Sequence, residues 1–134
     1  MMRSDSGKVT IFFTIIATSW VAMLGLVVVG GGRIRAYQRA DNVAAEAART
    51  AGSAIDAGSA ISGEAKVIDP DLATAAALDY LRAAGATGSV VISTDRIHLT
   101  VTAVITYTNP SGLEFIGGAT WQATGTANVT LLIG

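Results

Sequence analysis

Residues Val9 to Val29 read VTIFFTIIATSWVAMLGLVVV, a run without one charge or proline. At about 1.5 Å rise per residue, a helix over this run is about 31 Å long, which matches the roughly 30 Å hydrocarbon core of a bilayer. A buried core helix of a soluble domain is the alternative, but such a helix is usually shorter and carries a polar face. The run therefore predicts a transmembrane helix over residues 9–32, and everything downstream must be what this helix anchors.

The residues before the span, Met1 to Lys8, form a short polar tail. It resembles the start of a signal sequence, but the apolar run exceeds the roughly 7–15 residues of a signal-peptide core, which favours an uncleaved anchor. Arg33, Arg35 and Arg39 follow the span, and the positive-inside rule alone would keep that side in the cytoplasm. Long segments translocate largely regardless of charge, and the downstream strands are typical of an exported domain. We therefore expect a single-pass protein of the cell membrane, with tail 1–8 cytoplasmic and domain 33–134 extracytoplasmic.

Composition limits what this domain can be. About a hundred residues follow the span, enough for one small domain. The net charge is −1 and the basic residues are scattered, which argues against a nucleic-acid partner. The chain has no cysteine, so neither a disulfide framework nor a thiolate metal site is available.

Helical periodicity continues beyond the membrane exit. Apolar residues recur there at three- and four-residue steps, at Ile34, Tyr37, Ala40, Ala44, Ala47, Ala48, Ala51 and Ile55. Gly58 to Lys66 is rich in turn residues, and we expect a loop there. A second helix then starts with Asp69 as its N-cap and Pro70 in its first turn, and it ends at Gly85.

After Thr87-Gly88 the period changes from about 3.6 to 2. We expect strands over Val90–Thr94, Ile97–Thr108 and Trp121–Leu131, with Asn109-Pro110-Ser111-Gly112 breaking the chain after the second. The apolar faces of these strands need a cover, and the two helices are the available candidates. The predicted fold class is therefore α+β, with a three-stranded antiparallel meander packed against one long and one short helix.

The span itself carries one signal of association. Thr14, Thr18, Ala22 and Gly25 lie along a single helix face at four-, four- and three-residue steps. Small residues at this spacing let two membrane helices approach, and threonine hydroxyls can hydrogen-bond across the contact. The alternative is that small residues are simply common in this composition.

The glycine run Gly30, Gly31 and Gly32 is the weak point of the long helix, because each glycine costs roughly 1 kcal/mol against alanine. We interpret it either as a hinge at the membrane surface or as a site where another backbone comes close.

No residue pattern suggests catalysis. His98 is the only histidine and lies on the polar face of a predicted strand. With no cysteine and no paired carboxylate at ligand spacing, it cannot build a metal site by itself. The carboxylates are spread over helix faces, a cap, a loop and a turn and form no acid–base pair. The glycine run lacks the spacing and the following Lys-Ser/Thr of a phosphate loop. We therefore expect no enzyme, no catalytic residue, no cofactor and no metal.

Three stretches together resemble a known family. They are Ser6-Gly7-Lys8-Val9-Thr10, the closing LVVVGGGR of the span and DNVAAEAAR from Asp41 to Arg49, and they resemble the TadE/TadG-like pilus assembly proteins of actinobacteria. YLRAAGATGSVVIS and the threonine-rich strands fit the same family, so the resemblance covers nearly the whole chain. It implies a pilin-like fold and a minor pilin or pseudopilin of a tight-adherence (Flp-type) type IV pilus system.

The chain departs from this pattern at two positions. Relatives often carry an acidic residue where Gly30 stands, and processed pilins have glutamate five residues after the cleavage glycine. If Gly7 were that glycine, Phe12 would hold the place of the glutamate, so we expect the Gly7-Lys8 bond to stay uncut.

The resemblance and the span together predict a structural function, either in the membrane or in a surface filament. The expected partners are membrane lipid and other pilin or pilus-assembly subunits, in a homo- or hetero-oligomer. A membrane-tethered binding module that does not polymerise is the alternative from another class, and a membrane-anchored hydrolase would lack a catalytic constellation.

Overall fold

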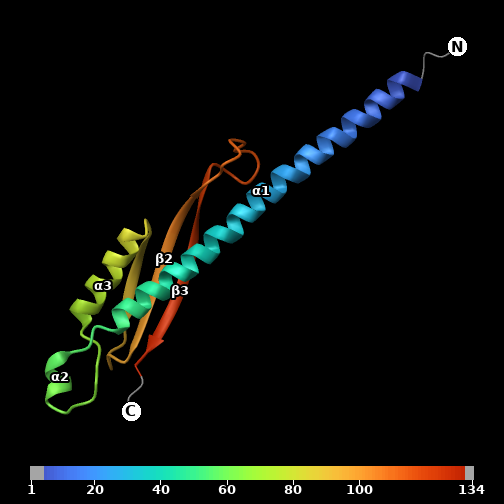
Figure 1. Ribbon diagram of the computed structural model, residues 1–134. Helices are drawn as coiled ribbons and strands as arrows, with labels where there is room; N and C mark the ends of the chain where they lie inside the picture. Colours follow the sequence, from blue (N-terminus) through green and yellow to red (C-terminus); the bar gives the residue numbers. More distant parts are fainter. Residues whose placement is uncertain (1–4, 132–134) are drawn as a thin grey trace.

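The computed structural model describes residues 5–131, which form three helices and three strands (Figure 1). The helices are α1 (Asp5–Gly52), α2 (Ala57–Ile61) and α3 (Pro70–Ala83). The strands are β1 (Thr87–Ile92), β2 (His98–Thr108) and β3 (Thr120–Thr130). The predicted α+β class is confirmed. Residues 1–4 of the predicted polar tail lie outside the described residues, and Asp5 to Lys8 form the first turn of α1.

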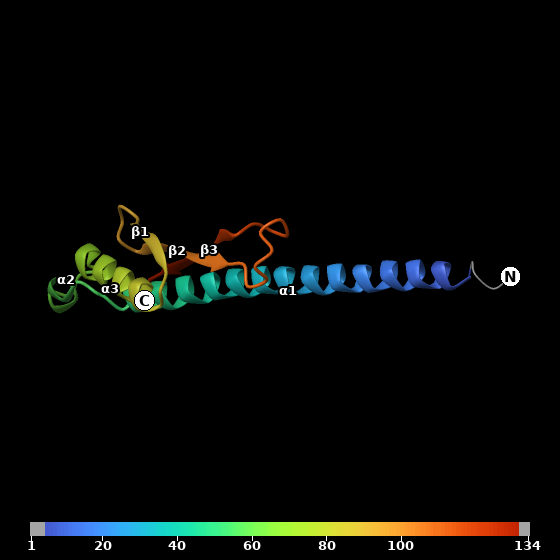
Figure 2. The ribbon, with the colours of Figure 1, turned by 90° about the horizontal axis from the view of Figure 1, so that it is seen from above.

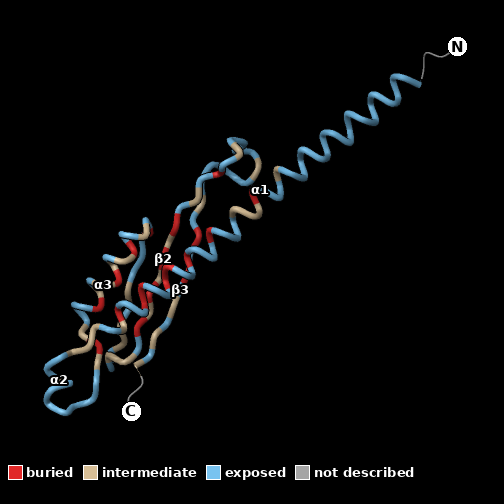
Figure 3. Tube along the Cα trace, in the orientation of Figure 1, coloured by how far each residue is buried: buried red, intermediate tan, exposed pale blue. Residues whose placement is uncertain are grey.

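The long helix α1 is one unbroken element of 48 residues. Figure 2 shows it as a straight rod with the strands along its C-terminal half. Its N-terminal half is exposed along its length up to Val28 apart from a half-buried Gly25, whereas buried side chains recur from Val29 onward (Figure 3). This helix is long and apolar enough to cross a membrane.

The domain half of α1 presents an almost continuous alanine face to the sheet. The buried residues of this half are Ala36, Ala40, Val43, Ala44, Ala47, Ala48 and Ala51. The predicted alanine stripe is confirmed, but the inclusion of Ile34 in it was wrong, because this side chain is exposed. Six residues, or about 240° around a helix of 3.6 residues per turn, separate Ile34 from Ala40, so it points away from the sheet.

The three strands form an antiparallel meander in the order β1-β2-β3. Leu99, Val101, Ala103 and Ile105 of the central strand β2 are buried, while the threonines between them lie on the other face. Helix α1 packs on β2 and β3, and α3 packs beside α1 and on β1. The predicted faces of the strands and their helical cover are therefore confirmed.

The start and end of α3 follow the predicted capping. The Asp69 side chain accepts hydrogen bonds from the backbone N–H groups of Asp71 and Leu72, and Pro70 occupies the first turn. Gly85 follows the end of the helix with a φ of 71°, a left-handed conformation that favours glycine.

Several boundaries differ from the prediction. Helix α1 ends at Gly52, so Ile55 lies outside the predicted helical stripe and pairs with Ile68 in an isolated bridge. The expected loop over Gly58 to Lys66 begins instead as helix α2, because the Asp56 carboxylate accepts hydrogen bonds from Gly58 N and Ser59 N and caps a helical turn. Strand β1 starts at Thr87 and ends at Ile92, not at Val90 and Thr94. Its pairing with β2 extends over Gly88 and Ser89, which carry no alternating apolar signal.

Candidate association surface of the long helix

The predicted association stripe is part of a longer stripe that runs along one face of α1. The same three- and four-residue steps continue from Gly25 into the domain half of the helix, through Val29, Gly32, Ala36, Ala40, Val43 and Ala47. Because a step of three or four residues returns to one helix face, all these residues lie on the same side. From Gly25 onward this face is covered by the chain's own β2–β3 connection and sheet, and before Gly25 it is exposed.

The two threonines of the stripe are exposed, and their hydroxyls are bonded within the helix. Thr14 Oγ1 donates to Thr10 O at 2.8 Å, and Thr18 Oγ1 donates to Thr14 O at 2.8 Å. A hydroxyl has one donor and two acceptor positions, so each threonine still offers its oxygen to a neighbour. In this arrangement Thr14, Thr18 and Ala22 present one open face of small residues.

Gly25, the fourth residue of the predicted stripe, lies under another part of the chain. The side chain of Ile116, which belongs to the β2–β3 connection, has its Cδ1 3.8 Å from the position of a Cβ at Gly25. The structure therefore separates Gly25 from the other three residues and closes the outer end of the open face.

The β2–β3 connection, residues 109–119, is here called the hairpin loop, and Asn109 organises it. The buried side chain of Asn109 donates through Nδ2 to the carbonyls of Ile116 at 2.8 Å and Gly118 at 2.9 Å. Its Oδ1 accepts from the backbone N–H of Ser111 at 3.0 Å. The loop is thus a defined substructure, whereas the sequence indicated a break after the strand and a short apolar segment over Leu113–Ile116, without the hydrogen bonds that hold them together.

The glycine run does not interrupt α1. A Cβ at Gly32 would overlap the ring of Tyr107, whereas Cβ atoms at Gly30 and Gly31 would meet nothing within 4 Å. Of the two interpretations of the run, close approach therefore describes Gly32, although the approaching group is a side chain and not a backbone. A hinge at Gly30 and Gly31 stays a prediction.

An aromatic cluster ties the sheet to the helix just beyond this run. Trp121 lies between Tyr107, with ring centroids 4.7 Å apart, and Tyr37, with ring centroids 5.8 Å apart. The guanidinium carbon of Arg33 lies 4.9 Å from the centre of the Trp121 ring, and Arg33 Nη2 donates to Gly117 O at 3.3 Å. Arg33 is therefore engaged by the domain through a cation–π contact and a hydrogen bond, which no sequence pattern indicated.

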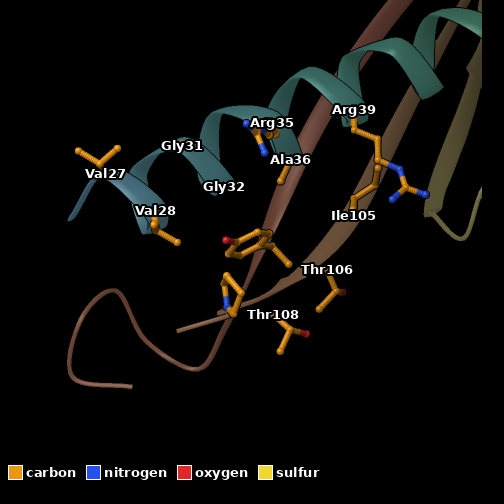
Figure 4. A pocket seen from close by; sticks show the side chains of 12 residues that line it. Val27, Val28, Gly31, Gly32, Arg35, Ala36, Arg39, Ile105, Thr106 and Thr108 are labelled. Carbon is orange, nitrogen blue, oxygen red and sulfur yellow. The ribbon is translucent and has the colours of Figure 1, made fainter. Parts of the chain in front are cut away.

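A groove of about 650 Å³ runs between α1 and β2 on one flank of the helix (Figure 4). Val27, Val28 and Gly31 line its end nearest the bare half of α1, and Arg35 and Arg39 line its other end. β1 pairs with β2 only over Leu99–Val104, so within residues 5–131 no strand covers this edge of β2 beside the groove. Such a groove can accept an apolar segment that carries a negative group.

The far end of the domain, at the β1–β2 turn, is polar and exposed. The Ser93 hydroxyl donates to the Asp95 carboxylate, and this bond together with the Ile97 N–H lowers the pKa of Asp95. His98 Nδ1 lies 3.0 Å from Thr130 Oγ1 on the exposed face of the sheet. Within residues 5–131 no three His, Asp or Glu side chains gather closely enough to hold a metal ion.

Comparison with known proteins gives no relative. No protein-family model, no curated protein and no solved structure matches this chain. What the protein does must therefore be inferred from its own residues and their arrangement.

Proposed function

We propose that this protein is a membrane-anchored structural component of a tight-adherence-type pilus or a related secretion apparatus, with the role of a minor pilin or pseudopilin. One observation carries the proposal: the bare apolar half and the core of the folded domain belong to the same unbroken helix, α1. The anchor and the domain are therefore joined by continuous helix and not by a separate linker segment. The resemblance to TadE/TadG-like proteins points to the same class of protein.

In this proposal the subunit associates with its neighbours inside the membrane through Thr14, Thr18 and Ala22. Apolar helices in lipid gain nothing from the hydrophobic effect when they meet, so contact depends on close packing and on interhelical hydrogen bonds. Small side chains allow the close packing, and the threonine oxygens remain free to accept hydrogen bonds. Because Ile116 lies over Gly25, a partner helix reaches along the stripe only as far as Ala22.

Bulk on this face should separate the helices. We expect Ala22→Leu to lower lateral cross-linking roughly 3- to 30-fold, which corresponds to the loss of about 0.6 to 2 kcal/mol of interhelical interaction. The chain has no cysteine, so Thr18→Cys gives a single site for disulfide cross-linking in native membranes, with and without Ala22→Leu.

The matched control is Ala17→Leu, the same change at an exposed position about 140° around the helix from Ala22. It should leave cross-linking at Thr18→Cys unchanged. Equal cross-linking in the two leucine variants would show that the stripe is only composition and that α1 is only an anchor.

A tethered binding module that does not polymerise is the second candidate, and the groove beside β2 favours it. The two functions predict different neighbours for the membrane span. A pilus component should form a Thr18→Cys disulfide between two copies of the chain, and its removal should abolish or shorten surface filaments seen by electron microscopy. A binding module should remain uncross-linked in the span and leave filaments unchanged.

The proposal also requires the domain to lie outside the cell. We expect protease added to intact spheroplasts to remove residues after the span, although Arg33, Arg35 and Arg39 argue for the opposite orientation. Immunoblotting against an N-terminal tag should then detect a short protected fragment. Full protection of the chain until detergent is added would reverse the orientation and remove the protein from the class of surface components.

A further inference from the structure

We propose that the hairpin loop, residues 109–119, inserts into the lipid–water interface of the membrane that α1 spans, so that the domain is held to the membrane at a second point. The inference rests on the anchoring part of the proposed function. It assigns a lipid-binding role to Leu113 and Phe115, which lie at the exposed side of this loop.

The hairpin loop contacts α1 within the apolar run. Ile116 reaches Gly25, and a Cβ at Gly117 would lie 2.8 Å from Cγ1 of Val29. Gly25 and Val29 both belong to the apolar run, and Gly25 lies four residues inside its outer end, which is about 6 Å along a helix.

The apolar run fits the bilayer with little room to slide. Its length of about 31 Å matches the hydrocarbon core of about 30 Å, and the charged Lys8 and Arg33 lie just outside its two ends. The interfacial layer on each side of that core is only about 5–8 Å thick. A loop that touches α1 at the level of Gly25 must therefore lie within the interface or at the edge of the hydrocarbon.

The chemistry of the loop suits this place. Phe115 is 82% exposed and Leu113 is 41% exposed, and both would leave water on insertion. Glu114 stands between them and is also exposed, so its carboxylate must remain among the lipid headgroups. Tryptophan and tyrosine are enriched at membrane interfaces, and Tyr107 and Trp121 pair at the ends of β2 and β3 that flank the loop.

The backbone hydrogen bonds of the loop suit it to a site with little water. Unpaired backbone groups are costly near hydrocarbon, and here several are bonded within the loop. Asn109 Nδ2 donates to the carbonyls of Ile116 and Gly118, while Gly118 N donates to Glu114 O at 2.9 Å and Ile116 N to Leu113 O at 2.9 Å. The hydrogen bond from Arg33 to Gly117 O then fixes the loop to α1.

Site-specific labelling of the full-length chain tests the inference. Because the chain lacks cysteine, Phe115→Cys and, with both apolar side chains kept, Glu114→Cys each accept one environment-sensitive fluorophore. The protein is placed in vesicles of phosphatidylethanolamine and phosphatidylglycerol. We expect blue-shifted emission at both sites, quenching by lipids that carry a quencher near the headgroup, and iodide quenching several-fold weaker than at a water-exposed control.

Ile61→Cys is that control, because Ile61 is an equally exposed apolar side chain, at 86%, in α2 at the opposite end of the domain (Figure 1). Val21→Cys, in the bare half of α1, reports the span. A loop label that behaves like the Ile61 label while the Val21 label is quenched by lipid would overturn the inference and leave the anchor intact.

Two further outcomes would contradict the inference. If the Val21 label is also quenched by iodide, α1 does not cross the bilayer, and the proposed function fails with the inference. If the loop labels are shielded from both iodide and lipid quenchers, protein covers the loop, and a second copy of the chain or another subunit replaces lipid as its partner.

Discussion

Gly125→Val is expected to separate β3 from α1 and to destabilise the domain by about 3 kcal/mol, at the upper end of what overpacking a core usually costs. A Cβ at Gly125 would overlap the backbone of Ala40 and Asp41. Backbone atoms of a helix cannot rotate away as a side chain can, so the strand itself must move. Ala40 and Ala103, the β2 partner of Gly125, are both fully buried at this contact.

The small size of the residues at this contact sets how closely the sheet approaches the helix. Gly125 on β3, Ala103 on β2 and Ala40 on α1 bring the two layers together, and the larger residues of the core fill the space around them. We therefore expect Gly125→Val to loosen the whole sheet face and not only one strand. Hydrogen exchange of the β2 and β3 amides, measured on the full chain in detergent micelles, should become markedly faster.

Thr126→Val is the matched control, because the next residue along β3 points to the exposed face. Valine is favourable in strands, so this change should leave exchange rates equal or slightly slower. If Gly125→Val exchanged as slowly as Thr126→Val, the close approach of β3 to α1 would be absent from the protein in solution.

Most elements of the fold could be predicted because each has a local period in the sequence. The apolar run over Val9–Val29, the alanine stripe after it and the alternation over Ile97–Thr108 all repeat over several turns or pairs of residues. A period of 3.6 or 2 says which side of an element is apolar, and it needs no knowledge of what packs there. The prediction was weaker at α2, where one carboxylate, Asp56, decides between a loop and a helical turn.

Contacts between distant segments have no such local signal. Arg33 and Gly117 are 84 residues apart, and nothing near either residue indicates that they are hydrogen-bonded. The same holds for Ile116 over Gly25 and for Tyr107 against Gly32. These contacts divide the candidate association stripe into an open and a covered part, so its true extent could not be predicted from spacing alone.

The continuity of the stripe, by contrast, follows from the spacing of residues in the sequence. Its three- and four-residue steps pass without a break from Thr14 to Ala47, from the proposed membrane span into the domain. One face of small residues thus allows close packing twice, first against a neighbouring helix in the proposed assembly and then against the chain's own sheet. The point at which the chain's own loop and sheet begin to cover the helix decides which part of the stripe is free for a neighbouring helix. This point depends on the folded structure and not on the spacing.

The second large effect is expected for Val101→Asp, which should destabilise the domain by about 4 kcal/mol at neutral pH. Val101 is fully buried at the centre of β2, opposite Val90 on one side and Ala127 on the other. No polar group faces it among these partners, so the introduced carboxylate would be buried without a hydrogen bond or a counter-charge. Thr102→Asp, one residue along on the opposite face, should cost about 1 kcal/mol or less.

The loss should depend on pH in a direction that identifies burial as its cause. Burial raises the pKa of the introduced carboxyl above its value of about 3.9 in the unfolded chain, so the folded state holds the proton more tightly. The penalty is therefore smallest below about pH 4 and grows as the pH rises through the folded pKa. Thermal unfolding of the full chain in micelles at about pH 4 and about pH 7 should show the Val101→Asp deficit widening, with little change for Thr102→Asp. Equal melting of the two variants at both pH values would mean that the faces of β2 are exchanged and that the helices cover the threonine side.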